Sequence, residues 1–177
     1  MAVQVVTGNV NQNVSFNEVG TLALNTSFAY PAAVPGLNFN YANTTGGALG
    51  VDTIYAHQYT LASTTVTIDL NGGSLLSPSG AACVFARVRE FVVDVVDTTG
   101  THKINVQAGA SSGVLWLPLA ANTLWATPNG GCLRLSDPNS INTAGYLVTN
   151  TQKNITFDSG AVTVIFNVLI VGNSSAS

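Results

Sequence analysis

Apolar and polar positions alternate with a period of two in several parts of the chain, a pattern typical of half-buried β-strands. The stretch Thr65–Leu70 places Val, Ile and Leu on one side and Thr, Thr and Asp on the other. A helical period of 3.6 residues is hard to find anywhere in the sequence. The pattern therefore predicts an all-β protein.

Turn residues divide the chain into short candidate strands. Asn71–Gly73 follows the first alternating stretch, and Asn129–Gly131 precedes the alternating stretch Cys132–Ser136. Asn and Gly adopt positive φ angles at little cost and so favour turns at both places. Strands this short, separated by turn residues, predict an antiparallel, jelly-roll-like β-sandwich. The other candidate strands are His102–Gln107, Thr123–Ala126, Tyr146–Thr149 and Asn154–Asp158.

Two longer stretches carry more information. In Val84–Val96 the apolar phase shifts by one residue around Arg89 and Glu90, which predicts a β-bulge. Val162–Val171 is apolar on both faces and predicts a central strand that is covered from both sides.

The first third of the chain has a different character. Pro31–Gly50 contains two prolines, four glycines and no charged residue, and predicts an irregular, extended connector. Val3–Val6 and Thr21–Phe28 are candidate short strands before it. We therefore expect an extended N-terminal arm over residues 1–50 and a sandwich domain over residues 51–177.

The chain is unusually poor in charge. Charged residues make up 7% of the sequence, against about 25% in typical soluble domains. The predicted surface is therefore mostly Asn, Thr, Ser, Gly and Ala. Such a surface has little electrostatic repulsion to keep copies apart and suits a protein packed against neighbours.

The same composition argues against several classes of protein. A net charge of −3 with isolated basic residues lacks the clustered positive charge that nucleic-acid binding needs. The apolar run Val162–Val171 is about half as long as a membrane-spanning helix. Met1–Val10 does not resemble a secretory signal, so we expect synthesis in the cytoplasm. A reducing cytosol favours free thiols at Cys83 and Cys132, although sequence alone leaves a disulfide between them open.

Candidate catalytic residues lack their required context. Gly109–Gly113 matches the G-x-S-x-G pattern of a nucleophile elbow, but no helix pattern follows it, so we expect a turn. His57 and His102 have no partners at metal-ligand spacing, and we expect no metal or cofactor. The remaining candidates are aspartates scattered over separate strands and turns, so we do not expect an enzyme. They are Asp94, Asp97, Asp137 and Asp158.

Four aromatic residues form the candidate interface or ligand platform. Trp116 and Trp125, with Tyr55 and Tyr59, have flat apolar rings on which a sugar stacks. Both tryptophans stand among leucines, however, which favours a place in the core or in a subunit interface. Both interpretations stay open at this point.

Several strand-level motifs resemble a group of small tailed-phage proteins that are usually found with head genes. The first motifs are Asp52–Ala56, Thr65–Leu70 with Gly72 and Leu75, and Phe85–Val88. The later ones are Asn129–Gly131, Tyr146–Val148 and the terminal strand Phe166–Gly172, which ends in a glycine. The resemblance covers about two thirds of the chain and does not extend to the N-terminal arm.

The resemblance implies a virion structural protein, similar to the jelly-roll proteins that decorate and cement phage capsids from outside. Its implied partners are the major capsid protein and further copies of itself, as a dimer or trimer, with no nucleic acid or membrane partner. Two alternatives stay open. One is a single-jelly-roll capsid subunit of a tailless virus, and the other is a receptor- or glycan-binding module on a virion.

Overall fold

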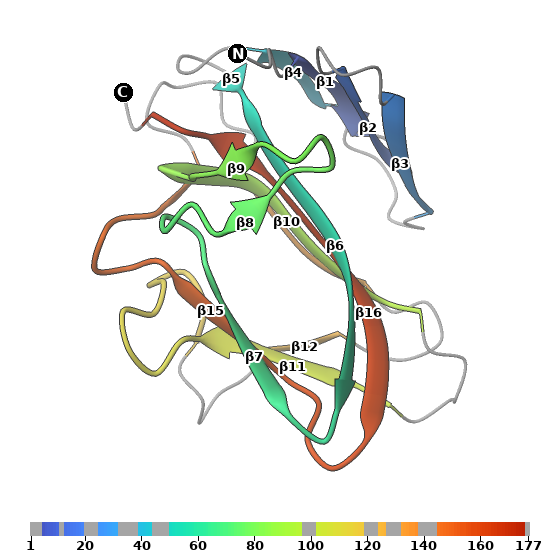
Figure 1. Cartoon of the computed structure of the whole chain (residues 1–177), viewed down its shortest axis with the longest axis vertical. Helices are drawn as coiled ribbons and strands as arrows, with labels where there is room; N and C mark the ends of the chain where they lie inside the picture. Colours follow the sequence, from blue (N-terminus) through green and yellow to red (C-terminus); the bar gives the residue numbers. More distant parts are fainter. Residues whose placement is uncertain are drawn as a thin grey trace.

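The structure is a computed structural model, in which the backbone is described for more residues than the side chains are. Backbone is described for residues 5–10, 13–19, 25–31, 39–43, 50–96, 102–118, 124–126, 132–137 and 145–175. Side chains are described for residues 51–96, 102–118, 132–137 and 145–175. The regular elements in these residues are all β-strands, and no helix occurs among them. The predicted all-β class is confirmed, and two facing antiparallel layers agree with the predicted sandwich (Figure 1).

The first layer is a four-stranded antiparallel sheet. Its order is β13 (Cys132–Ser136), β10 (Arg87–Val95), β16 (Thr163–Asn173) and β6 (Thr53–Ala62). A short strand, β14 (Tyr146–Leu147), also pairs with β10. The predicted central strand is thus confirmed as β16, which lies between β10 and β6.

The second layer is also four-stranded and antiparallel. Its order is β12 (Leu124–Ala126), β11 (Ile104–Ala108), β15 (Asn154–Asp158) and β7 (Thr65–Asp69). A small hairpin of β8 (Leu75–Leu76) and β9 (Ala82–Cys83) lies beside the layers. The turn predicted after β7 is present: the Asn71 N–H donates to Asp69 Oδ1 at 2.9 Å, and Gly73 has a φ of 69°.

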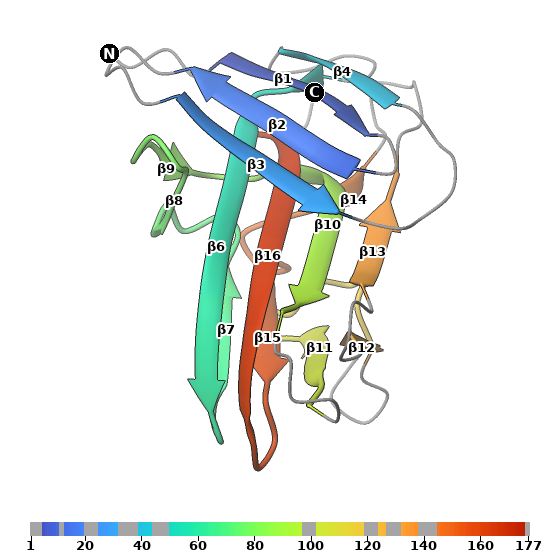
Figure 2. The same ribbon diagram turned by 90° about the vertical axis from the view of Figure 1, so that its right-hand side faces the viewer.

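The N-terminal strands pair with one another in a separate sheet. Its order is β3 (Asn25–Pro31), β2 (Asn13–Val19), β1 (Val5–Val10), β4 (Phe39–Asn43) and the two-residue β5 (Gly50–Val51). The prediction of an irregular connector is wrong at Phe39–Asn43, because this uncharged stretch pairs antiparallel with β1. Figure 2 shows this sheet crossing one end of β6, β16 and β10. The boundary at residue 50 stays a prediction.

The core lies between the two layers. Strand alternation directs the apolar side chains of both layers inward, and the phenylalanines at the centre are fully buried. They are Phe85, Phe91, Phe157 and Phe166. This burial is the main source of stability for a chain with few ion pairs.

The predicted bulge is confirmed at Arg89. The pairing of β10 with β16 shifts register between Val88 and Glu90, so Arg89 is the extra residue. Beyond this point Gly172 lies opposite Val88, and a Cβ at Gly172 would overlap the carbonyl oxygen of Arg87. The bulge and the glycine together bring the two strand ends into close contact.

Candidate functional site

A cleft opens beside β6, the edge strand of the first layer. Residues of β6 line one wall, and the segment Ser74–Pro78 lines the other, enclosing about 500 Å³. The β6 residues are Ala56 and the three ring-bearing residues Tyr55, His57 and Tyr59, which share the inner face because strand side chains alternate. Two of the four predicted platform residues therefore lie together.

The three rings of this wall form a row. His57 stacks on Tyr55 at 6.0 Å between ring centroids and meets Tyr59 edge-on at 4.5 Å. The hydroxyls of Tyr55 and Tyr59 are hydrogen-bonded at 2.5 Å. Tyr55 is buried and Tyr59 half-buried, whereas His57 is exposed. The row thus presents an imidazole edge to solvent above a fixed pair of phenols.

Burial determines the protonation of both phenols. Burial, followed by the hydrogen bond to Tyr59, raises the pKa of Tyr55 far above its ordinary range. Burial also raises the pKa of Tyr59, although its hydrogen bond with Tyr55 has the opposite effect. Both hydroxyls therefore stay neutral at physiological pH. They serve as hydrogen-bond donors and acceptors rather than as bases.

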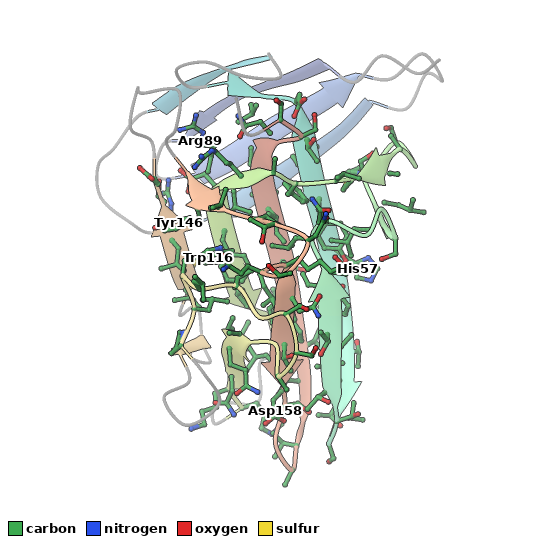
Figure 3. The ribbon with its side chains drawn as sticks, turned by 90° about the vertical axis from the view of Figure 1, so that its left-hand side faces the viewer. His57, Arg89, Trp116, Tyr146 and Asp158 are labelled. Carbon is green, nitrogen blue, oxygen red and sulfur yellow. The ribbon has the colours of Figure 1, made fainter. Side chains whose placement is uncertain are left out.

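Trp116 lies elsewhere, at the far end of a band of rings that crosses the core (Figure 3). Its ring meets Phe91 at 5.6 Å and Tyr146 at 5.1 Å. Phe91 in turn contacts Phe157 at 6.3 Å, and Phe157 lies 6.0 Å from Tyr59. Trp116 is thus separated from the cleft by two phenylalanines. The side chain of Trp125 lies outside the described residues.

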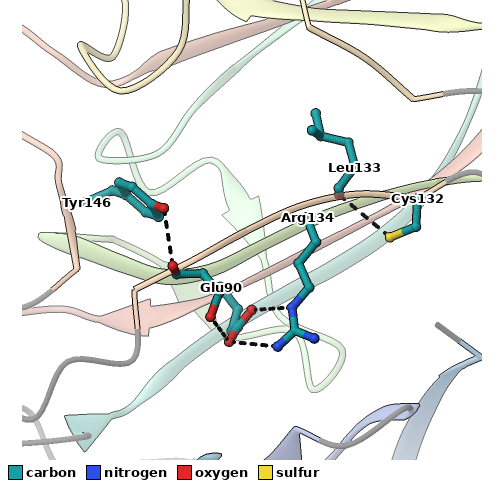
Figure 4. A network of polar contacts seen from close by, with 6 residues as sticks. Glu90, Cys132, Leu133, Arg134 and Tyr146 are labelled. Carbon is teal, nitrogen blue, oxygen red and sulfur yellow. Dashed lines mark hydrogen bonds and ion pairs between the residues drawn. The ribbon is translucent and has the colours of Figure 1, made fainter. Parts of the chain in front are cut away.

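A buried polar network on β10 and β13 was not predicted (Figure 4). The carboxylate of Glu90 is fully buried and accepts two hydrogen bonds from Arg134, at 3.0 and 3.1 Å. The Ser136 hydroxyl donates to the same carboxylate at 2.6 Å. Glu90 pairs directly with Ser136 in the sheet, so strand register brings these groups together. The only signal in the sequence is that Glu90 directly precedes the apolar run Phe91–Val93.

The two cysteines are free thiols, as a reducing environment favours. Cys83 is buried, and its thiol donates to the Ile54 carbonyl at 3.1 Å. Burial, followed by the nearby charge of Asp94, raises the pKa of Cys132 to about 11. Cys132 is therefore a poor nucleophile at neutral pH.

The G-x-S-x-G match is a turn, as predicted. Residues 110–112 form the turn, Ser112 has a φ of 51°, and its carbonyl accepts hydrogen bonds from the N–H groups of Lys153 and Asn154. A strand-to-helix elbow is not formed here. Within the described residues, no group of His, Cys, Asp and Glu side chains has metal-binding geometry. In the same part of the chain, no helix has the length and apolar character to cross a membrane.

The part of the surface that the structure describes carries few charged groups. Of the Asp, Glu, Lys and Arg side chains that the structure describes, Lys103 alone is exposed, and the others are half-buried or buried. Large apolar side chains are exposed instead, with Leu115 at 77% and Leu76 at 56% exposure. This combination is typical of surfaces that contact other macromolecules.

Comparisons with known proteins gave no match, either to a protein-family model, to a curated protein or to a solved structure.

Proposed function

We propose that this chain is a virion structural protein that decorates and cements the outside of an assembled phage head. In this proposal it binds the major capsid protein and further copies of itself, carries out no catalysis, and binds neither nucleic acid nor membrane. It is made in the host cytoplasm and acts in the virion. The strand motifs that resemble head-associated phage proteins support the assignment.

The observation that carries the proposal is the order of the strands. Counted from β6 onward and without the two-residue strands, the strands of the first layer are the sixth, third, eighth and first, and those of the second layer are the fifth, fourth, seventh and second. Except for the hairpin of β11 and β12, successive strands thus alternate between the two layers, which supports a jelly roll made of two Greek keys. Jelly rolls occur both in viral capsid proteins and in sugar-binding lectins. A jelly-roll fold is therefore compatible with either function, and the choice between them depends on the surface and the site.

The low surface charge of the described residues favours a protein that binds to other subunits over one that remains a free monomer. Surface charge keeps soluble proteins apart, and the charged side chains that the structure describes are, apart from that of Lys103, half-buried or buried. Exposed apolar groups such as Leu76, Leu115 and Leu147 are available for contact with a shell. A protein that binds only the assembled shell stabilises it by mass action, increasingly as its sites fill.

The test is to delete the gene and to analyse purified particles. We expect the protein in wild-type virions by mass spectrometry, and mutant capsids that assemble but release DNA at lower temperature. Absence from the particles, or unchanged heat resistance of the mutant capsids, contradicts the proposal. Copy number separates it from the capsid subunit of a tailless virus, because that subunit is itself required for the shell to form.

The cleft favours one second candidate, a binding module for a sugar ring. Tyr59 supplies an aromatic face, and the linked phenols of Tyr55 and Tyr59 supply hydroxyl groups that match those of a sugar. This candidate predicts a hit on a glycan array that is lost in Tyr59→Ala and retained in Leu115→Ala, which changes an exposed residue outside the cleft. No hit with the folded wild-type protein contradicts it.

A further inference from the structure

The outer edge of β6 is unpaired in the described part of the chain. β6 is the last strand of its sheet and pairs with β16 from Thr53 to Ala62 without a register shift. The β8–β9 hairpin contacts only its beginning, where Cys83 donates to the Ile54 carbonyl, and Ser74–Pro78 faces β6 as far as Tyr59 across the cleft. The stretch Ala56–Ala62 therefore presents a regular strand edge.

Two hydrogen bonds set the direction of the backbone groups. The Ser63 N–H donates to the Val162 carbonyl, and the Val96 N–H donates to the Ile165 carbonyl. Hydrogen-bonded pairs alternate along an antiparallel ladder, so the odd-numbered residues of β6 bond to β16. The N–H and C=O groups of Ala56, Gln58 and Thr60 consequently point away from the sheet.

This edge lacks the usual protection against pairing. Natural edge strands carry Lys, Pro, bulges or inward-pointing charges that prevent another strand from joining them. β6, with the sequence TIYAHQYTLA, has no proline, no Lys, Arg, Asp or Glu, and no bulge in its pairing with β16. A regular, uncharged edge of this length indicates that another strand covers it in the working protein.

We propose that the strand is β6 of a second copy, paired antiparallel across a two-fold axis at Gln58. In this register Gln58 is opposite itself, and Ala56 is opposite Thr60 of the partner subunit. These are the residues whose backbone groups point outward, so the pair forms about six hydrogen bonds. The two four-stranded sheets then join into one continuous sheet.

The side chains are compatible with this register on both faces. On the inner face His57 comes opposite Tyr59 of the partner subunit, in the closer, non-hydrogen-bonded positions where aromatic pairs stabilise a sheet. On the outer face the opposed residues are small or uncharged, namely Ala with Thr and Gln with Gln. No like charges meet, which is the condition that a strand must satisfy to pair with itself.

This inference deepens the self-association in the proposed function and names its surface, but it is independent of capsid binding. It also selects between the predicted oligomers, because a two-fold strand pair closes as a dimer and not as a trimer.

The first experiment measures the mass of the full chain by light scattering. We expect twice the chain mass of 18.2 kDa for the wild type. Gln58→Pro removes an outward N–H from each copy, a change that a free strand edge tolerates, and is expected to give a monomer. Gln58→Lys and Gln58→Glu each oppose like charges and are expected to weaken the dimer roughly tenfold. An equal mixture of the last two is expected to restore it as a heterodimer, visible by native mass spectrometry.

The matched control is Ala110→Lys, which places the same charge on an exposed turn after β11 and is expected to leave the dimer intact. Thermal melting of each variant distinguishes loss of pairing from loss of folding. A monomeric wild type, a trimer, or a dimer that neither Gln58→Pro nor the charge variants weaken overturns the inference. Capsid binding is measured on the same samples: a dimer that binds no capsid contradicts the proposed function alone, and a monomer that binds contradicts the pairing alone.

Discussion

The two layers of the sandwich share one core but differ in their outer faces. The outer face of the second layer carries exposed polar side chains such as Thr65 and Thr67, as expected of a sheet that faces water on one side. The outer face of the first layer buries apolar groups such as Val92 and Leu169 completely, and the N-terminal sheet crosses one end of this layer (Figure 2). The polar or apolar character of the outward-facing residues therefore indicates whether that face of a sheet is covered, even where the sequence does not show which segment covers it.

The largest expected effect comes from the core that both layers share. Phe157 is fully buried and its ring contacts those of Phe91, Phe166 and Tyr59. We expect Phe157→Ala to lower the free energy of unfolding by about 3–5 kcal/mol, through lost burial and the cavity left behind. Urea denaturation followed by circular dichroism measures the change. A loss below about 1 kcal/mol would show that the two layers do not depend on a common core.

The buried polar network of the first layer comes next. Glu90→Gln keeps the shape of the side chain but removes the charge that Arg134 contacts. We expect a loss of about 2–3 kcal/mol, because the half-buried guanidinium of Arg134 loses the carboxylate that it contacts. Urea denaturation measures it. Glu90→Gln in an Arg134→Met background is the control, and a loss of the same size there would show that Arg134 is not involved.

A matched exchange tests the two outer faces directly. Val92→Thr and Thr65→Val swap the same two β-branched side chains on the outer faces of β10 and β7. We expect Val92→Thr to cost about 1–3 kcal/mol, since it buries a hydroxyl, and Thr65→Val, at an exposed position, to change stability by less than about 0.5 kcal/mol. Equal effects in urea denaturation would mean that both faces meet the same environment.

The smallest effect concerns the half-buried ion pair between Lys153 and Asp69, at 2.7 Å. Partial burial raises the pKa of Asp69, but hydrogen bonds from Lys153 and the Asn71 N–H outweigh it, so the net pKa is lowered. The stability that Asp69 contributes is therefore present above the ordinary Asp pKa of about 3.9 and is lost as pH falls through the folded value. We expect Lys153→Met to cost about 0.5 kcal/mol at pH 7 and to flatten the loss of stability in acid. Melting temperatures from pH 7 to pH 2 check this, and an unchanged acid profile contradicts it.

Local patterns in the sequence predicted much of the fold. The correct predictions each concern the two faces of a single strand. They are the alternation in Thr65–Asp69, the phase shift at Arg89 and the apolar strand β16. The connector prediction failed at Phe39–Asn43, because composition does not reveal pairing with a distant strand such as β1.

The candidate site was less accessible to sequence reasoning. The link between Tyr55 and Tyr59 follows from their spacing on one strand face, once the strand is known. The contact of Glu90 with Arg134 depends on the register of two strands that are 44 residues apart. The neighbours of Trp116 are likewise set by the packing of the two layers, and no local pattern contains that information.

The close approach at Gly172 has a consequence for how this fold is recognised. Since any side chain there would collide with the backbone of Arg87, every sequence that keeps this bulge and pairing needs a glycine at the end of its last strand. Most surface positions, by contrast, accept many polar residues. Distant relatives would thus share a fingerprint of one glycine and one phase shift, rather than an overall similarity of composition.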